Sequence, residues 1–300
     1  MILERHPLRV VEALDRRVLG ACQLIDAATA LPVVAPVHVE ARAASVGATS
    51  VPLTGHAVRI VRNRRGVCVL FRAPFFDTYA ATFLNPANPP ETAVDPLRLT
   101  LAITDAGPHH LPQQFQINLP RSLDPAVANS VFQPLPIRVF RAPSTPVQEG
   151  WAVLRVRVTQ AGTNPLRPLP GVLVRVFRSP RAAADAPIGE GMTDWRGAIS
   201  GEALVPIAGV PRFQPGAGQN VVVSDQPIVF EATRHSGFTG AGAQLPDTPA
   251  LMAGTGTGLI RPPAVPAGSQ LSVLRPAGVT AAEPMLIKAA REFIVHLAMP

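Results

Sequence analysis

Two stretches decide the fold of this chain: LPGVLVRV (Leu169–Val176) and, further along, TDWRGAISGEALV (Thr193–Val205). The first places an apolar run directly after a Pro-Gly corner. The second has an Asp-x-x-Gly turn that leads into another apolar run. Pro and Gly reverse the chain, and the β-branched residues that follow favour extended backbone. The two stretches therefore predict β-strands that are joined through polar turns.

The composition of the whole chain is consistent with a β protein. Hydrophobic residues make up 47% of the 300 residues and charged residues only 16%, so the chain can bury a sizeable core and does not have the composition of a disordered protein. The 34 prolines cannot lie within many helices or central strands. Such a proline content is typical of short strands that are joined by many loops.

Runs rich in β-branched residues recur along the chain and are separated by turn residues. Their spacing favours antiparallel β-sandwiches over alternating β-α units. We predict strands at 18–25, 36–43, 56–62, 67–72, 97–104, 113–119, 135–141, 151–159, 171–178, 198–205, 220–223, 227–233 and 270–274.

The segment APSTPVQEG (142–150) has the composition of a linker and divides the chain into two halves. Each half contains a Pro-bounded corner, an apolar strand, and a polar turn that ends in Arg-Gly before the next strand. In the first half these are ALPVVAPVHVEA (30–41) and NRRGVCVLF (63–71), and in the second NPLRPLPGVLVRVF (164–177) and DWRGAISGEALV (194–205). This parallel indicates a divergent internal duplication.

The second half resembles the carboxypeptidase regulatory-like, or transthyretin-like, β-sandwich family, whose members carry a PLPGAxVxV strand followed by TDxxGxF. Ile199 stands where the family has an aromatic residue, and the resemblance covers about residues 165–207. It implies a fold that serves many functions. Domains of this kind also occur as accessory or decorating subunits of phage-tail-like contractile particles. The matching residues are Leu169, Pro170, Gly171, Val172, Val174, Thr193, Asp194 and Gly197.

We therefore expect a mainly β protein with two tandem antiparallel β-sandwich domains of immunoglobulin or transthyretin type and a C-terminal helix. The expected domains are 1–147 and 148–274, the second with a long Gly/Pro-rich loop at 236–268, and the helix occupies 275–300. Two features of the sequence favour this helix: a capping box and an apolar stripe at helical spacing. The capping box is Thr280 with Glu283, and the stripe is Leu286, Ala290, Phe293 and Leu297.

The motifs that usually carry chemistry are missing from the sequence. It contains no GxGxxG, P-loop, HExxH, CxxC or GxSxG, and the adjacent His109 and His110 would point to opposite faces of an extended chain. Intradiol dioxygenases share the sandwich architecture, but they hold iron with two tyrosines, and this chain has only Tyr79. Transthyretin-like hydrolases use a Ser-Thr-rich C-terminus, whereas this chain ends in LAMP (297–300). We expect no catalytic residues, no cofactor and no metal site.

We expect the chain to contact other proteins through apolar side chains. Phe75, Tyr79 and Phe83 lie at i, i+4 and i+8, one face of a short helix, so they form either a contact patch or core packing. Trp195 belongs to the Asp-x-x-Gly turn, where we expect it to be exposed. The remaining candidate interface residues lie on the stripe of the predicted C-terminal helix: Leu286, Phe293 and Leu297.

The net charge of +7 comes almost entirely from arginine, since Lys288 is the only lysine. The arginines are scattered and not interleaved with aromatic residues, which argues against nucleic-acid binding. A solvated basic surface explains them, and an acidic protein surface as partner is the alternative. Cys22 and Cys68 are either two small buried hydrophobes or a disulfide pair.

The first seventeen residues contain no uninterrupted apolar region typical of a secretion signal, and no run of 18 apolar residues occurs that could span a membrane. We expect a cytoplasmic protein at synthesis, which can be released as part of a particle. The expected function is that of a non-catalytic subunit of an oligomeric assembly, such as an accessory component of a phage-tail-like contractile particle. A glycan- or surface-binding module is the alternative.

Overall fold

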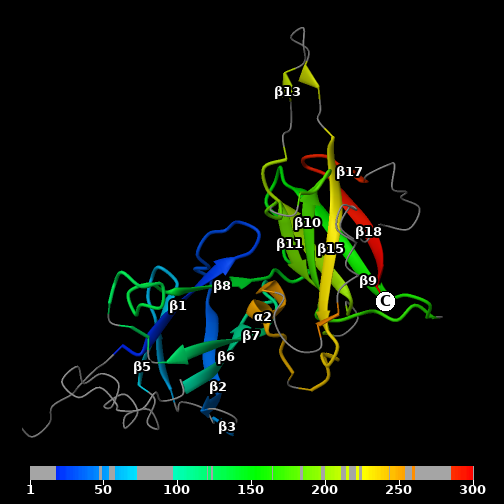
Figure 1. The fold of residues 1–300 in the computed structure, drawn as a ribbon. Coiled ribbons are helices and arrows are strands. Elements are labelled where there is room, and N and C mark those ends of the chain that lie inside the picture. The colour runs from blue at the N-terminus through cyan, green and yellow to red at the C-terminus, as the bar shows by residue number, and fades with distance from the viewer. Residues whose placement is uncertain are drawn as a thin grey trace, which may run out of the picture.

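The protein is mainly β within the residues that the structure describes, as predicted, and α2 (Thr248–Ala253) is a helix of six residues (Figure 1). The computed structural model describes residues 18–46, 49–53, 58–72, 97–119, 121–122, 124–163, 165–182, 185–196, 200–210, 214–215, 221–222, 225–242, 244–253, 259–260 and 285–299.

The first half forms two four-stranded sheets, with strand orders β4-β5-β1-β8 and β3-β2-β6-β7. In the first sheet β1 pairs with β5 antiparallel and with β8 parallel, and all pairs of the second sheet are antiparallel. The strands are β1 (Gly20–Asp26), β2 (Val37–Val46), β3 (Thr49–Pro52), β4 (Arg59–Arg62), β5 (Val67–Arg72), β6 (Leu97–Asp105), β7 (Gln113–Leu119) and β8 (Leu135–Val139).

The second half forms a three-stranded sheet of order β12-β9-β18 and a larger sheet in which β11, β10 and β15 are consecutive and β16 and β17 both pair with β15. A short hairpin, β13-β14, lies apart from both sheets. The strands are β9 (Ala152–Gln160), β10 (Leu173–Arg178), β11 (Gly189–Met192), β12 (Glu202–Ile207), β13 (Gln214–Pro215), β14 (Val221–Val222), β15 (Gln226–His235), β16 (Leu259–Ile260), β17 (Met285–Ile287) and β18 (Glu292–Met299).

Seven strands of each half follow the same order. The order β5-β1-β8 in one sheet of the first half corresponds to β12-β9-β18: β5 and β12 are antiparallel to the middle strand, and β8 and β18 are parallel to it. In the other sheet of the first half, the antiparallel order β3-β2-β6-β7 corresponds to β11-β10-β15-β17. The strands that the sequence pattern matched, β2 with β10 and β5 with β12, therefore occupy equivalent positions.

Each half has its own buried apolar cluster, to which strands of both of its sheets contribute. In the first half, β1 contributes Leu24, β2 contributes Val39 and β6 contributes Leu99, and all three are buried in one cluster. In the second half, Val156 of β9 and Phe230 of β15 are buried in a separate cluster. The cores form because alternate residues of each strand point to the same face, and that face is apolar.

The residues of the family resemblance hold one corner of the second half together. Thr193 is fully buried, and its hydroxyl accepts a hydrogen bond from the backbone N–H of Val172 at 2.8 Å and donates one to the carbonyl of Leu169 at 2.8 Å. The carboxylate of Asp194, also fully buried, accepts from the backbone N–H of Arg196 and pairs with its guanidinium. These residues therefore stabilise the fold at this corner.

The predicted C-terminal helix is wrong. Residues 285–287 and 292–299 form β17 and β18, which complete the two sheets of the second half. The apolar residues of this segment fit a helical spacing, but they also alternate with a period of two, as in a strand. In the structure Val295, Leu297 and Met299 are buried and Ile294 is exposed, which is the strand pattern. Eight residue pairs with β9 satisfy the backbone of β18, and this long-range pairing overrides the local helix signal.

Three further expectations need correction. The pairings of β8 with β1 and of β18 with β9 are parallel, so the sheets are not purely antiparallel. The second half continues to the C-terminal strands instead of ending at residue 274. The segment 236–268 is not a plain loop, because it contains α2 and β16. The predicted strand at 270–274 and the capping box at 280–283 lie outside the described residues.

Candidate functional site

The junction between the two halves contains an apolar contact. Phe140, just after β8, and Leu111, just before β7, belong to the same buried cluster as Leu173 of β10, Met192 of β11 and Leu251 of α2. Each of these side chains is at most 3% exposed. The outer face of the β10-β11 sheet therefore packs against the first half, and the helix α2 covers the contact.

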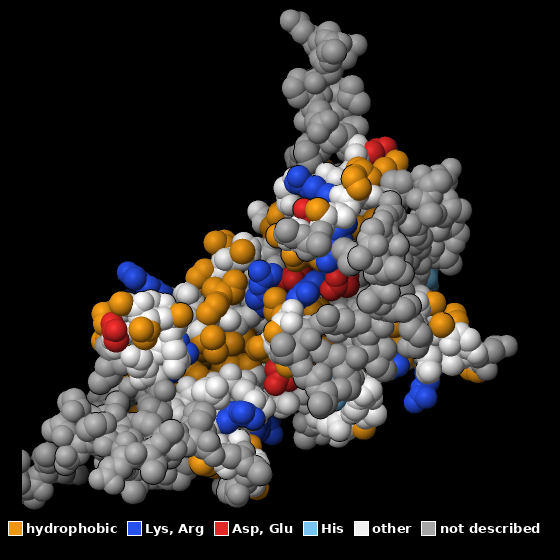
Figure 2. Space-filling model, in the orientation of Figure 1, with side chains coloured by type: hydrophobic (Ala, Val, Ile, Leu, Met, Phe, Trp, Pro, Cys, Tyr) orange, Lys and Arg blue, Asp and Glu red, His pale blue; other side chains and the backbone are white. Residues whose placement is uncertain are grey.

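A network of charged side chains continues the junction beyond the apolar contact. The side chain of Glu190 in β11 is only 3% exposed and pairs with Arg138 of β8 in the first half and, at 3.3 Å, with Arg175 of β10. Arg175 also donates to the carbonyl of Met252 in α2 at 2.7 Å. Figure 2 shows basic and acidic side chains gathered between the two halves. These pairs connect β8, β10, β11 and α2 across the junction.

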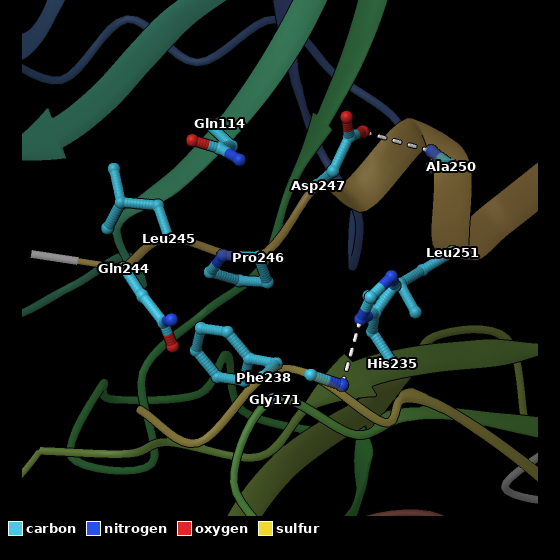
Figure 3. A pocket seen from close by; sticks show the side chains of 11 residues that line it. Gln114, Gly171, His235, Phe238, Gln244, Leu245, Pro246, Asp247, Ala250 and Leu251 are labelled. Carbon is cyan, nitrogen blue, oxygen red and sulfur yellow. Dashed lines mark hydrogen bonds between the residues drawn. The ribbon is translucent and has the colours of Figure 1, made fainter. Parts of the chain in front are cut away.

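A cavity of about 330 Å³ lies beside this contact (Figure 3). It lies where β7 of the first half meets the end of β15 and the segment before α2. The backbone N–H of Gln114 in β7 donates to the carbonyl of Pro246 at 3.0 Å. This bond holds the segment before α2 against β7. The cavity is lined by Gln114, Gly171, His235, Gly237, Phe238, Gln244, Leu245, Pro246, Asp247, Ala250 and Leu251.

Two aromatic rings form one wall of this region. Phe238, which lines the cavity, meets Trp195 edge to face, with ring centroids 5.3 Å apart and an interplanar angle of 88°. Trp195 is half-buried and packs against the junction cluster, so the expectation that it is exposed is wrong. Phe238 can lie over the Pro-Gly corner because Gly171 has no side chain: a Cβ there would be 2.3 Å from the Phe238 ring.

The polar groups of the cavity are held by local hydrogen bonds. The carboxylate of Asp247 accepts from the backbone N–H of Ala250 at 3.1 Å at the start of α2, and burial raises the pKa of this carboxyl group. The hydrogen bond from Ala250 opposes that rise. Nδ1 of His235 accepts from the backbone N–H of Gly237 at 3.1 Å, so the proton of the neutral ring is on Nε2.

These groups favour a particular ligand chemistry. The amides of Gln114 and Gln244 can both donate and accept hydrogen bonds, Asp247 is an acceptor when ionised, and Phe238 offers a ring. Amides, a carboxylate and an aromatic ring together suit a neutral molecule that carries several hydroxyl groups. Within the described part of the chain, no three His, Cys, Asp or Glu side chains are grouped so that they could hold a metal ion.

The structure separates the candidate interface residues that the sequence suggested. Phe75, Tyr79 and Phe83 lie outside the described residues. Leu286 is exposed on β17, Phe293 is half-buried against the core of its own half, and Leu297 is buried in that core with 1% exposed. With Trp195 at the junction, the four described candidates do not form one surface.

The sequence arguments missed the residues of the cavity. Gln114 lies in β7, Phe238 in the turn after β15 and Asp247 directly before α2. They meet only because the two halves dock. One signal was present: Asp247-Thr248-Pro249 precedes Ala250-Leu251-Met252, and an Asp followed by Pro is a typical helix start.

No protein-family model matches the sequence, and a search of curated proteins finds no significant match. The resemblance to the carboxypeptidase regulatory-like family therefore depends on the motif residues alone. Among the helices that the structure describes, none is long and apolar enough to cross a membrane.

Proposed function

We propose that this chain is a non-catalytic structural subunit of a larger protein assembly, built from two tandem β-sandwich domains. The observation that supports this proposal best is the edge strand β18. It pairs with β9 on one side along its whole length, and among the described residues no strand pairs with its other side. The unpaired N–H and C=O groups of an edge strand are a template on which another chain can add a strand.

The side chains of β18 add a hydrophobic contact to this edge. Ile294 is 74% exposed, although its neighbour Val295 is buried. In the first half, the equivalent strand β8 lies at the junction, where Arg138 pairs with Glu190 of the second half. A partner on β18 would cover the second half much as the second half covers β8.

The assembly that we propose is a phage-tail-like contractile particle, in which the chain is an accessory or decorating subunit. The support for this is the resemblance of residues 165–207 to regulatory-like sandwiches, some of which occur in such particles. In symmetric assemblies, repeated subunits are held together by contacts between exposed surfaces, such as the open edge of β18.

The native mass of the protein purified from its own host, with mass spectrometry of the chains that accompany it, tests the proposal. We expect a large complex that contains sheath-like or tube-like proteins. Replacing Ile294 by Glu should release the chain from this complex while leaving it folded. Val34→Glu is the matched control, because Val34 is 75% exposed in the first half. A lone monomer in the host would contradict the proposal.

A glycan- or surface-binding module is the second candidate, and the junction cavity supports it. A screen of neutral glycans by thermal shift would identify a ligand, since a ligand that binds only the folded state raises the Tm. Gln114→Ala should weaken that binding by about tenfold, which corresponds to one lost hydrogen bond. Gln116→Ala is the control, because Gln116 lies two residues along β7 and is exposed. Equal binding by both variants would exclude the cavity.

A further inference from the structure

The two cysteines of the chain face each other across two neighbouring strands. Cys22 lies in the central strand β1 and Cys68 in β5, and they are directly opposite in the antiparallel register. The chain has 300 residues and only these two cysteines. In the equivalent strands of the second half, facing core pairs such as Val156 with Ala203 are aliphatic. Packing alone therefore does not require cysteine at this position.

The distance between facing residues suits a disulfide. Residues directly opposite in an antiparallel pair have Cα atoms about 4.5–5.5 Å apart. Disulfides span Cα distances of about 4.4–6.8 Å, so the backbone need not move. Both side chains also point into the same core, with Cys22 fully buried and Cys68 1% exposed, and both thiols are free in this structure.

The two sulfur atoms already interact. Hydrogen bonding between the two side chains raises the pKa of Cys22 and lowers that of Cys68. Burial opposes the lowering at Cys68, and the positive charge of Arg62 assists it. Arg62 is the residue opposite Cys68 on β4, so Cys22, Cys68 and Arg62 form a row across three adjacent strands.

We propose that Cys22 and Cys68 are a disulfide-forming pair that closes while the chain folds in the presence of a small-molecule disulfide such as glutathione disulfide. The Cys68 thiolate attacks one sulfur of glutathione disulfide, breaks its S–S bond and releases one glutathione. Cys22 then attacks the Cys68 sulfur, its proton passes to the leaving sulfur, and the second glutathione departs. The protein loses two electrons and two protons, and glutathione disulfide takes them up to become two glutathione molecules.

The bond would tie β1 to β5 and enclose the segment that carries β2, β3 and β4. Closing a long loop restricts the unfolded chain and thereby stabilises the folded one. The burial of both sulfurs would protect the bond from reductants once the half has folded. The pair would thus lock the first half in an oxidising medium and leave it unlocked in a reducing one.

Refolding of the full chain from denaturant tests the proposal, because both thiols are then accessible. The chain is refolded in glutathione buffers of increasing disulfide fraction, alkylated and weighed by intact mass spectrometry. We expect a product that is lighter by two hydrogens and resists alkylation, with a Tm higher on the order of 5–10 °C than that of the reduced chain. A chain with two alkylated thiols, with glutathione on both cysteines, or with a lower Tm after oxidation would overturn the proposal.

The replacement of both cysteines by alanine gives the matched control. The Tm of the Cys22→Ala, Cys68→Ala variant should not respond to glutathione disulfide. Oxidation of the natural chain is read directly from its mass, so the test does not depend on how well this variant folds. A Tm response of equal size in the variant would show that the shift arises elsewhere and would overturn the stabilising role of the bond.

Discussion

The sheet β3-β2-β6-β7 of the first half corresponds in strand order to β11-β10-β15-β17 of the second, yet the outer faces of these two sheets differ. In the first half this face carries polar, solvent-facing side chains such as His38, Arg98 and Gln116. In the second half the same face carries Leu173 and Met192, which are buried against the first half. One topology can therefore present either a solvated surface or a docking surface, and the residues at alternate strand positions decide which.

The burial patterns of equivalent strands show the same difference. Strand β2 alternates buried and exposed residues over most of its length, whereas β10 has Leu173, Val174, Val176 and Phe177 all buried. A strand that is apolar on both faces is covered on both faces. The near-continuous apolar run LPGVLVRVF thus indicates that a further layer packs on the second half, here the first half and α2.

The largest expected effect comes from removing the apolar contact between the halves. Phe140→Ala should lower the free energy of unfolding by about 3–5 kcal/mol, since Phe140 is fully buried. Chemical denaturation followed by fluorescence and circular dichroism measures this loss. We also expect the halves to unfold in separate steps. Phe132→Ala should cost little, because Phe132 is 66% exposed, and equal losses in the two variants would contradict the role of the junction.

The charged network at the junction should have the next largest effect. Glu190→Ala leaves Arg138 and Arg175 without this carboxylate, and we expect a loss of about 2–3 kcal/mol, since one partner of a largely buried pair is removed. Glu292→Ala breaks an exposed pair with Arg155 and should cost at most about 1 kcal/mol. Thermal unfolding at two salt concentrations distinguishes the buried from the exposed ion pair. A larger loss of stability for Glu292→Ala than for Glu190→Ala would contradict the stabilising role of the junction network.

Substitutions at two glycines with positive φ distinguish the cost of backbone strain from the cost of steric crowding. Gly162 has a φ of 73° and open space around its Cα, so Gly162→Ala should cost about 1 kcal/mol. Gly171 has a φ of 64°, and its Cβ would meet the Phe238 ring, so Gly171→Ala should cost about 2 kcal/mol. Denaturant unfolding measures both, and equal costs would show that Phe238 does not lie over the corner.

The smallest effects concern two aspartates, one in each half, whose contributions to stability change with pH in opposite directions. Burial alone would raise the pKa of Asp105, but hydrogen bonds from Gly107 and His110 bring the pKa below its ordinary value. The contribution of Asp105 is therefore fully present above the ordinary pKa and is lost as the pH falls through the lowered value. In the Asp105→Asn variant, the Tm should therefore fall less steeply than in the natural chain as the pH is lowered.

For Asp247 the sign is reversed. Burial raises its pKa, so the folded protein binds this proton more tightly than the unfolded chain, and stability falls as the pH rises through the raised pKa. Asp247→Asn should remove this fall and raise stability near neutral pH by a few tenths of a kcal/mol, since the site is partly solvated. A Tm profile from about pH 3 to pH 8 tests both aspartates. A less stable Asp247→Asn chain at neutral pH would contradict the assignment.

The positions of several strands could be predicted from local sequence, whereas the C-terminal strands could not. Of the predicted strands, 97–104 and 113–119 agree closely with β6 and β7. In REFIVHLAM, the apolar residues satisfy both a helical spacing and a period of two. A short segment cannot decide between these, and only the pairing of β18 with β9 resolves it.

The candidate site was beyond sequence reasoning for a related reason. The cavity residues Gln114, Phe238 and Asp247 lie in separate segments of the chain and have ordinary local patterns. Likewise, Cys22 and Cys68 lie opposite each other because of the register between β1 and β5, which their separation in the sequence does not reveal.

By itself, the sequence determined that the protein is mainly β, because alternation, turn residues and proline act within a few residues of the chain. Only the tertiary structure decided how the halves dock, which sheet edges remain open and which cysteines face each other. Those features depend on contacts between residues far apart in the sequence, and no local pattern encodes such contacts.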